Sequence, residues 1–320
     1  MTDTATSTRP YSPPSQADTW VYFEGEIRQY RDARVGLMTH ALHYGTGCFE
    51  GIRAYWSEEK GQLYALSVAE HFERLVQSAG ILHMEVPLRV EQMTELTLDL
   101  LRRNGYREDV YIRPLVYKAS EEIGVRVHDL RDAFAIYMQP FGAYVDTEQG
   151  LRCMVSSWRR VDDNAAPARS KCTGIYINSA LAKTEAMENG FDEAIVLTHD
   201  GHVCEGSAEN LFIIRKGVVH TPAVTENILE GITRNTLIHL LREEMGLEVV
   251  ERAIDRSELY VADEVFLCGT GAQVAPVIEI DRRRIGDGEP GPMTLKLQRD
   301  YFDICKGRNP KYRDWLDPVY

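Results

Sequence analysis

One of the eight lysines of the chain has surroundings suited to covalent chemistry. Lys171 lies in Ala166-Pro-Ala-Arg-Ser-Lys-Cys-Thr-Gly174, among small side chains between a predicted strand and a predicted helix, and Arg169 is two residues away. Partial burial and a cationic neighbour both lower the pKa of a lysine, and a neutral amine can attack a carbonyl carbon to form a Schiff base. Lys171 is therefore a candidate nucleophile, and an exposed loop lysine is the alternative.

Two short glycine-containing segments have the features of an anion site. Gly231 precedes Ile232 and Thr233 at a predicted helix start, where free backbone N–H groups and the helix dipole favour a negative charge. The segment 268–272, with Thr270 between two glycines, ends a predicted strand and could present further amides. A phosphate would suit this arrangement. Ordinary capping of the helix by Thr233 is the alternative.

Two carboxylates follow a predicted hairpin turn. Glu205 and Glu209 lie in Cys204-Glu-Gly-Ser-Ala-Glu-Asn210, where small residues interrupt a strand. A carboxylate among small, partly apolar neighbours can be buried so that it faces a ring nitrogen. For both residues a solvated position at a sheet edge is the alternative.

A tyrosine and an arginine share one face of another predicted strand. Tyr111 and Arg113 are two residues apart, which puts both side chains on the same side. Pro114 favours an edge position for that strand. A guanidinium fork beside a phenol can bind a carboxylate, although Arg113 could equally form a structural ion pair with one of the 49 acidic residues.

Interleaved strands and helices must position these residues. Ser67-Val-Ala-Glu70 has the sequence of a capping box at a helix start, and Asp200-Gly201 predicts a hairpin between 193–197 and 211–214. Hydrophobic periodicity predicts further strands at 20–23, 63–66, 110–117, 133–139, 153–157, 248–254 and 265–268. It predicts helices at about 90–103, 176–189, 232–245 and 294–305.

The length of 320 residues suggests two domains with a cleft between them. Residues 1–18 are rich in Thr, Ser and Pro, so we expect a disordered tail. The polar stretch 145–150 breaks the periodicity, which places a small domain at 19–145, an interdomain linker at 146–152 and a larger domain at 153–320. Because hairpins accompany the alternation of strands and helices, the expected fold class is α+β.

Composition and charge limit the classes of partner. The chain is 44% hydrophobic and 27% charged, without an apolar run of membrane-spanning length, which is typical of a soluble globular protein. Its net charge of −13 argues against nucleic acid and anionic membranes as partners. The six cysteines lack metal-site spacing and no secretory leader is apparent, so we expect a reduced, cytoplasmic protein without a metal.

Together these segments resemble the class IV, or fold type IV, pyridoxal-phosphate aminotransferases, and most closely the branched-chain amino acid aminotransferases. The resemblance runs from about Tyr22 to the C-terminus. Its most specific motifs are His40-Ala-Leu-His-Tyr-Gly-Thr46, Phe49-Glu-Gly-Ile-Arg53, Tyr111-Ile-Arg-Pro114, Phe141-Gly-Ala-Tyr144, Glu205-Gly-Ser-Ala-Glu-Asn-Leu-Phe212, Gly231-Ile-Thr-Arg234, Ala262-Asp-Glu-Val-Phe266 and Gly269-Thr270. The resemblance implies a small N-terminal α/β domain, a larger pseudo-barrel C-terminal domain and pyridoxal 5′-phosphate between them.

The resemblance also assigns the cofactor residues. Lys171 would be the catalytic residue, which bonds to the cofactor and carries a proton between the substrate α-carbon and the cofactor, whose ring acts as an electron sink. Glu205 would keep the pyridine nitrogen protonated, and Tyr176 would contact the cofactor. The phosphate would be bound by Arg74, Ile232, Thr233 and Thr270.

The activity implied by the resemblance is a ping-pong transamination between Leu, Ile or Val and 2-oxoglutarate. The substrate carboxylate would meet the Tyr111 hydroxyl and the amides of Thr270 and Gly271. Apolar walls would accept the branched side chains but discriminate among them by only about 1 to 3 kcal/mol per methylene. In the same pocket Arg113, with Tyr44 and Tyr144, would hold the distal carboxylate of glutamate or 2-oxoglutarate.

The remaining residues implied for the substrate pocket are Phe49, Phe141, Ile123 and Val125. Ile123 and Val125 resemble residues that reach the pocket of a neighbouring subunit, so a homodimer or a higher homo-oligomer is the expected working unit.

Several positions depart from the family pattern. Ala208 stands where glycine is common, Gly271 where alanine is common, and Phe141 where tryptophan occurs. Glu230 replaces a proline and would bring an unexpected acid close to the phosphate site. The alternatives are related enzymes of the same fold that act on D-amino acids, (R)-amines or aminodeoxychorismate, or a non-catalytic protein that binds through this fold.

Overall fold

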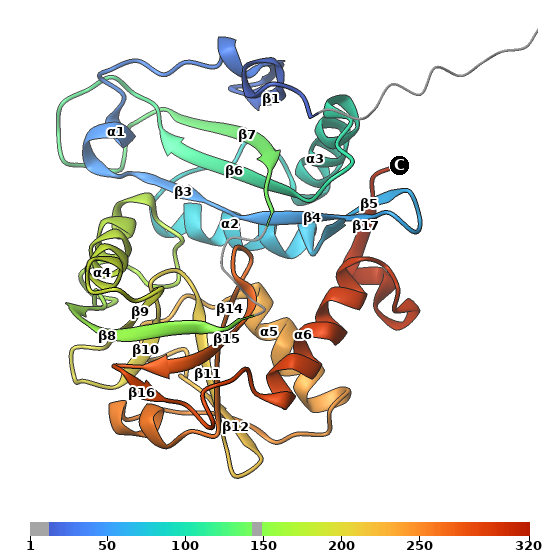
Figure 1. Ribbon diagram of the computed structural model, residues 1–320. Coiled ribbons are helices and arrows are strands. Elements are labelled where there is room, and N and C mark those ends of the chain that lie inside the picture. The colour runs from blue at the N-terminus through green and yellow to red at the C-terminus, as the bar shows by residue number, and fades with distance from the viewer. Residues whose placement is uncertain (1–12, 143–148) are drawn as a thin grey trace, which may run out of the picture.

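The computed structural model describes residues 13–142 and 149–320, which fold around two β-sheets. In Figure 1 the sheet built from the N-terminal part of the chain lies above the sheet built from the C-terminal part. Strands and helices alternate while most strand pairs are antiparallel, so the expected α+β class is confirmed. No helix in the described ranges is long and apolar enough to cross a membrane.

The first sheet is antiparallel throughout, in the order β17-β5-β4-β6-β7-β1-β2, with β3 also paired to β6. Along β6 and β7, Tyr111 lies opposite Gln139 and Arg113 opposite Tyr137. The strands are β1 (Trp20–Phe23), β2 (Glu26–Gln29), β3 (Gly47–Phe49), β4 (Ile52–Ser57), β5 (Gln62–Leu66), β6 (Val110–Lys118), β7 (Asp132–Pro140) and β17 (Leu316–Pro318).

The second sheet is mixed, in the order β10-β9-β8-β15-β14-β11-β12-β13, with β16 paired to β15. Its parallel pairs are β8 with β9, β8 with β15, and β12 with β13. The strands are β8 (Leu151–Arg159), β9 (Glu193–Leu197), β10 (Val203–Gly206), β11 (Asn210–Arg215), β12 (Val218–Thr221), β13 (Val249–Glu251), β14 (Glu264–Gly269), β15 (Gln273–Ile280) and β16 (Arg283–Arg284).

Helices cover the sheets, and the four predicted from residue 90 onward are found within three residues of the expected ends. The α-helices are α1 (His40–Tyr44), α2 (Val68–Ile81), α3 (Val90–Asn104), α4 (Tyr176–Glu188), α5 (Ile232–Glu243) and α6 (Pro292–Cys305). Short 3₁₀ helices are η1 (Gln16–Asp18), η2 (Tyr30–Asp32), η3 (Thr173–Ile175), η4 (Arg256–Val261) and η5 (Pro310–Trp315).

Each sheet has its own apolar core. In the first, Val110 and Ile112 of β6 pack with Phe72 of α2, so the alternate residues of β6 face the opposite side. In the second, the rings of Phe212 and Phe266 stack 4.8 Å apart beneath α5 and α6. The other face of the second sheet is also packed, since Leu211 and Leu267 belong to a further apolar cluster, whereas the free face of β6 carries Tyr111 and Arg113.

Three expectations about local structure are wrong. Ser67 has a left-handed backbone (φ 52°) and no capping hydrogen bond, so 67–70 is not a capping box. The Asp200-Gly201 turn joins β9 to β10, not to 211–214, which forms β11 in another part of the sheet. Strand β6 is central and not at an edge, since it pairs with β3 and β4 on one side and with β7 on the other. Pro114 is tolerated there because it faces the gap between β3 and β4, where no N–H is needed and its carbonyl accepts from the Glu50 N–H at 2.9 Å.

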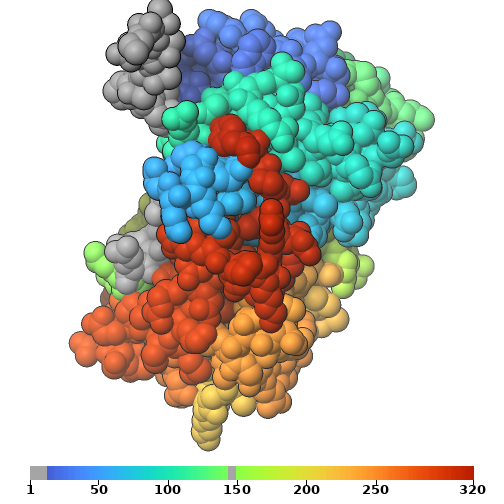
Figure 2. Space-filling model, turned by 90° about the vertical axis from the view of Figure 1, so that its right-hand side faces the viewer, coloured from blue at the N-terminus to red at the C-terminus, as the bar shows by residue number. Residues whose placement is uncertain are grey.

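The end of the chain crosses back to the first sheet. β17 pairs with β5, so the second lobe does not hold the whole of 153–320. Figure 2 shows this C-terminal segment in red, lying against the blue residues of the first lobe. Residues 13–18 of the expected tail are described, and they include η1. Residues 149–152 of the expected linker are described, and β8 already begins at Leu151. Tyr144 lies outside the described residues.

A buried carboxylate from one strand caps a distant helix, and we expect it to be important for stability. Glu264 of β14 accepts hydrogen bonds from the N–H groups of Met293 and Thr294 at 3.0 and 2.8 Å and from the Thr294 hydroxyl at 2.7 Å. Glu264→Ala leaves these donors unsatisfied, so the free energy of unfolding in urea should fall by roughly 2 kcal/mol or more. The exposed control Glu289→Ala should change it by less than about 0.5 kcal/mol; equal effects of the two variants would contradict this role.

Candidate active site

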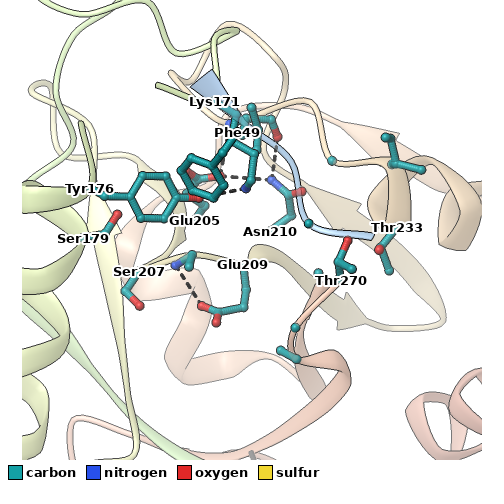
Figure 3. Close-up of a pocket in the computed structure, with 18 of the residues that line it drawn as sticks. Phe49, Lys171, Tyr176, Ser179, Glu205, Ser207, Glu209, Asn210, Thr233 and Thr270 are labelled. Carbon is teal, nitrogen blue, oxygen red and sulfur yellow. Dashed lines mark hydrogen bonds between the residues drawn. The ribbon is translucent and has the colours of Figure 1, made fainter. Parts of the chain in front are cut away.

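A cavity of about 330 Å³ lies between the two sheets. It is bounded by β6 and β7, the loop before α4, the break between β10 and β11, the start of α5 and the loop after β14. In Figure 3, Thr233 and Thr270 lie on one side of this site and Tyr176 and Ser179 on the other. The predicted site residues that line the cavity are Phe49, Arg74, Tyr111, Arg113, Phe141, Lys171, Tyr176, Glu205, Ile232, Thr233, Thr270 and Gly271.

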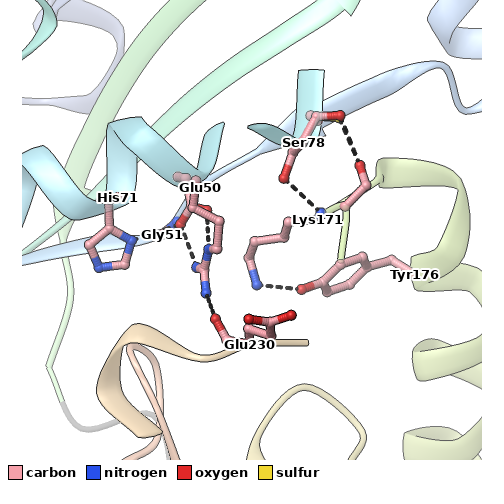
Figure 4. Close-up of polar contacts among 10 residues, drawn as sticks. Glu50, Gly51, His71, Ser78, Lys171, Tyr176 and Glu230 are labelled. Carbon is pink, nitrogen blue, oxygen red and sulfur yellow. Dashed lines mark hydrogen bonds and ion pairs between the residues drawn. The ribbon is translucent and has the colours of Figure 1, made fainter. Parts of the chain in front are cut away.

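Lys171 is half-buried, and its amine faces the cavity. The amine donates to the Tyr176 hydroxyl at 2.8 Å (Figure 4). The backbone of Lys171 is fixed to the first lobe, because its N–H donates to Ser78 Oγ at 3.2 Å and its carbonyl accepts from the Phe49 N–H at 3.1 Å. The alternative of an exposed loop lysine is therefore wrong.

Arg169, the positively charged residue two positions before Lys171, forms ion pairs with two acidic side chains. The guanidinium of Arg169 lies 3.0 Å from Glu230 and 3.9 Å from Asp163, and it is half exposed. The carboxylate of Glu230 is likewise 44% exposed, so this unexpected acid forms an ion pair at the rim of the site.

Glu205 is a buried carboxylate with defined partners. Its Oε1 lies 3.0 Å from Arg160, and its Oε2 accepts from Asn210 Nδ2 at 3.1 Å and from the Leu229 N–H at 3.2 Å. Burial raises the pKa of Glu205 despite the opposing charge of Arg160. Since a carboxylate oxygen can accept two hydrogen bonds, Oε1 retains capacity for one more donor.

Glu209 is buried in the same wall of the cavity, so neither acid is a solvated edge residue. Its Oε2 accepts from the Ala208 N–H at 3.0 Å. Burial, and then the nearby charge of Glu193, raise the pKa of Glu209 to about 8. Glu209 therefore holds a proton at neutral pH more readily than an ordinary glutamate does.

The start of α5 has the free backbone donors that an anion site needs. Gly231 is the N-cap residue, so the alternative in which Thr233 caps the helix is wrong, and no side chain of the described residues accepts a hydrogen bond from the first N–H groups of α5. The first N–H groups of a helix have no partner within the helix, and here Ile232 and Thr233 line the cavity. A Cβ at Gly231 would approach Asn210 Oδ1 to 2.0 Å, which explains the glycine at this turn.

Arg74 of α2 adds a cationic side chain to this part of the cavity from the first lobe. Its Nε and Nη2 donate to the two oxygens of Glu50 at 2.7 and 2.8 Å, and its Nη1 donates to the Glu230 carbonyl at 2.8 Å. The guanidinium thereby joins the first lobe to the turn before α5, and it lines the cavity.

Aromatic rings form the opposite wall. The ring centroids of Tyr111 and Phe141 are 5.1 Å apart, and those of Phe49 and Tyr176 are 4.7 Å apart. Arg113 lies between these pairs: its Nη2 donates to the Tyr111 hydroxyl at 3.0 Å, and its guanidinium carbon is 4.3 Å from the Phe49 ring centroid. This wall is mainly aromatic, and Arg113 is its charged side chain.

Three predicted residues lie elsewhere. Tyr44 does not line the cavity among the described residues; its hydroxyl accepts from the Gly124 N–H at 3.3 Å. That bond attaches it to the loop carrying Ile123 and Val125, whose side chains are 88% and 92% exposed. Tyr44 therefore belongs with these two residues and not with Arg113 in the cavity of its own chain.

Sequence reasoning missed several lining residues. Tyr137 and Gln139 face the cavity because they pair with Arg113 and Tyr111, and the two-residue alternation of 133–139 could have indicated them. Arg160 and Asn210 contact Glu205 through the tertiary fold, for which the sequence carries no local signal.

Comparison with known proteins identifies the family. The family description Amino-transferase class IV matches residues 47–280. The chain belongs to the class IV aminotransferases. It is 52% identical to a probable branched-chain-amino-acid aminotransferase of Aquifex aeolicus (strain VF5), over 94% of this chain and 97% of that protein.

Solved structures agree with the fold type IV architecture of this aminotransferase. The branched-chain aminotransferase of Thermoproteus uzoniensis with norvaline has a TM-score of 0.90 and 43% identity, over 94% of this chain and 99% of that one. The branched-chain amino acid aminotransferase of Thermobaculum terrenum in its PLP form has a TM-score of 0.91 and 40% identity, over 96% and 100%.

The cofactor of this class is pyridoxal 5′-phosphate, and the cavity fits it. The amine of Lys171 can bond to its aldehyde, and the free acceptor site of Glu205 suits its ring nitrogen. The uncapped start of α5 with Arg74 suits its phosphate.

Proposed function

We propose that the protein is a branched-chain amino acid aminotransferase, which moves the amino group of L-leucine, L-isoleucine or L-valine to 2-oxoglutarate. One observation carries this proposal: the Lys171 amine, a buried carboxylate and an uncapped helix start face a single cavity whose other wall is aromatic. The names of the similar proteins support it.

Residues from both lobes would hold the cofactor. Arg74, the Ile232 amide, Thr233 and Thr270 would bind the phosphate, while Glu205 would hold a proton on the pyridine nitrogen. When bound, the cofactor supplies an electron sink that makes the α-carbon of the amino acid acidic. The raised pKa of Glu205 reflects burial, and its contact with Arg160 favours the charged form that a protonated ring needs.

Lys171 would move the proton. Its Nζ would accept the proton from the substrate α-carbon and deliver it to the cofactor, which requires a mobile amine held close to the reacting atoms. The fixed backbone of Lys171 keeps the root of the side chain in place, and the Tyr176 hydroxyl at 2.8 Å orients its end.

The aromatic wall would serve two unlike substrates. Phe49, Phe141 and Tyr111 offer apolar surface to a branched side chain, and one of the similar structures holds norvaline, an unbranched aliphatic amino acid. Arg113 would bind the distal carboxylate of glutamate or 2-oxoglutarate. The substrate α-carboxylate would meet the Tyr111 hydroxyl and the amides near Gly271.

A cytoplasmic homodimer would be the working unit. Ile123 and Val125 expose almost their whole apolar side chains, and Leu37 and Leu42 nearby in α1 and its approach are 81% and 61% exposed. A second copy covering this surface would bury them, and Tyr44, which holds the same loop, would then border the partner's pocket.

Amino-donor specificity tests the proposed activity. With 2-oxoglutarate as acceptor, kcat/KM for L-leucine should exceed that for D-alanine and for (R)-1-phenylethylamine by at least about tenfold, because the cavity combines a carboxylate site with an apolar wall. D-alanine as by far the best donor would contradict the proposal and favour the D-amino-acid alternative.

Arg113→Met tests the dual pocket. Loss of a charge-assisted hydrogen bond should raise KM for 2-oxoglutarate by about tenfold or more and leave KM for 4-methyl-2-oxopentanoate within about threefold. The half-exposed Arg131, which pairs with Glu24, offers the control Arg131→Met. Equal changes for both oxo acids would show that Arg113 acts on the pocket as a whole and not on the distal carboxylate.

A further inference from the structure

A buried carboxylate stands directly behind the arginine of the anion site. Glu50 lies between β3 and β4, is fully buried, and forms a two-point contact with Arg74 at 2.7 and 2.8 Å (Figure 4). His71, one turn before Arg74 on α2, places its Nδ1 2.7 Å from Glu50 Oε2. Glu50 does not line the cavity described above, whereas His71 borders a small adjoining pocket that shares Thr233 and Thr270 with that cavity.

Burial and mutual contacts shift the pKa values of Glu50 and His71. Burial alone would raise the pKa of Glu50, but Arg74 and His71 together lower it well below its usual range, so Glu50 remains a carboxylate. Burial lowers the pKa of His71 against the opposing effect of Glu50. Since a carboxylate can only accept, the Nδ1 of His71 carries the hydrogen of this bond.

The contacts leave Arg74 with a defined set of free donors. A guanidinium has five N–H groups. Within the described part of the chain two are used by Glu50 and one by the Glu230 carbonyl, so one N–H remains on each terminal nitrogen. Because the two-point contact with Glu50 fixes the plane of the guanidinium, it also fixes where these two N–H groups point.

We propose that Glu50 is a positioning residue for the cofactor phosphate: it holds Arg74 so that its two free N–H groups meet the phosphate beside the start of α5. His71 supports Glu50 through its Nδ1–H. This inference rests on the proposed function, since it requires pyridoxal phosphate in the cavity, and it concerns a fully buried residue, Glu50, that does not line that cavity.

The charges make the proposal distinguishable from a simple electrostatic effect. Glu50 neutralises Arg74, so removing the negative charge makes the site more positive. If only net charge mattered, a phosphate would bind more tightly after this change. If orientation matters, the phosphate binds more weakly in spite of the added positive charge.

Binding of two ligands to the cofactor-free protein separates these cases. In Glu50→Gln, the dissociation constant of pyridoxal 5′-phosphate should rise at least about tenfold, as for a lost charge-assisted hydrogen bond. The dissociation constant of pyridoxal, which lacks the phosphate, should stay within about twofold. An unchanged or tighter affinity for pyridoxal phosphate, or an equal loss for both ligands, would overturn the proposal.

Two further variants complete the test. Glu258 forms a similar two-point contact with Arg252, at 2.8 and 2.6 Å, outside the cavity, so Glu258→Gln is a matched control that should leave both dissociation constants unchanged. In an Arg74→Gln background, adding Glu50→Gln should weaken pyridoxal phosphate binding no further, because Glu50 acts only through Arg74. A further loss in that background would assign Glu50 another role.

Folding and function are checked separately. Glu50→Gln leaves a buried guanidinium without its counter-charge, so circular dichroism and the unfolding midpoint are measured for each cofactor-free variant. If Glu50→Gln does not fold, Glu50→Asp decides, because it keeps the charge but is too short for both contacts: selective loss of pyridoxal phosphate affinity supports the proposal and an equal loss overturns it. If the unmodified protein itself binds no pyridoxal phosphate, the proposed function fails first.

Discussion

The site depends on the attachment of the loop that carries Lys171 to the first lobe. The backbone of Lys171 bonds to Ser78 of α2 and to Phe49 of β3, and the Ser170 hydroxyl donates to the Ser78 carbonyl at 3.1 Å. These bonds join a segment that follows β8 of the second sheet to the first sheet. Without them the amine would have no fixed position relative to the arginine and the aromatic wall, which come from the first lobe.

Buried charges around the cavity are arranged in pairs that leave selected atoms free. Glu205 is balanced by Arg160 and Arg74 by Glu50, so the cost of removing each charge from water is offset by its partner. In both pairs the contacts use only part of the hydrogen-bonding capacity. The remaining acceptor site of Glu205 and the remaining donors of Arg74 are the groups suited to a ring nitrogen and a phosphate.

Local sequence signals predicted the residues whose roles depend on local structure. Lys171, Glu205 and the Gly231 turn lie at interruptions of regular elements, and periodicity placed Tyr111 and Arg113 on one face. Glu50 and Arg160 were missed because their partners are distant in the sequence. Pro114 misled the prediction for β6, since only the folded sheet reveals the gap between β3 and β4 that accommodates a residue without an N–H. The contact of Tyr44 with the loop at Gly124 was not predicted for a similar reason, because it follows from tertiary packing.

The central claim is that the Lys171 amine bonds covalently to the cofactor. Borohydride reduction of the holoenzyme followed by peptide mass spectrometry tests it directly, because reduction converts that bond into a permanent one. The account predicts a phosphopyridoxyl group on Lys171 and on none of the other seven lysines. Modification of a different lysine, or a reduced holoenzyme without a modified peptide, would contradict it.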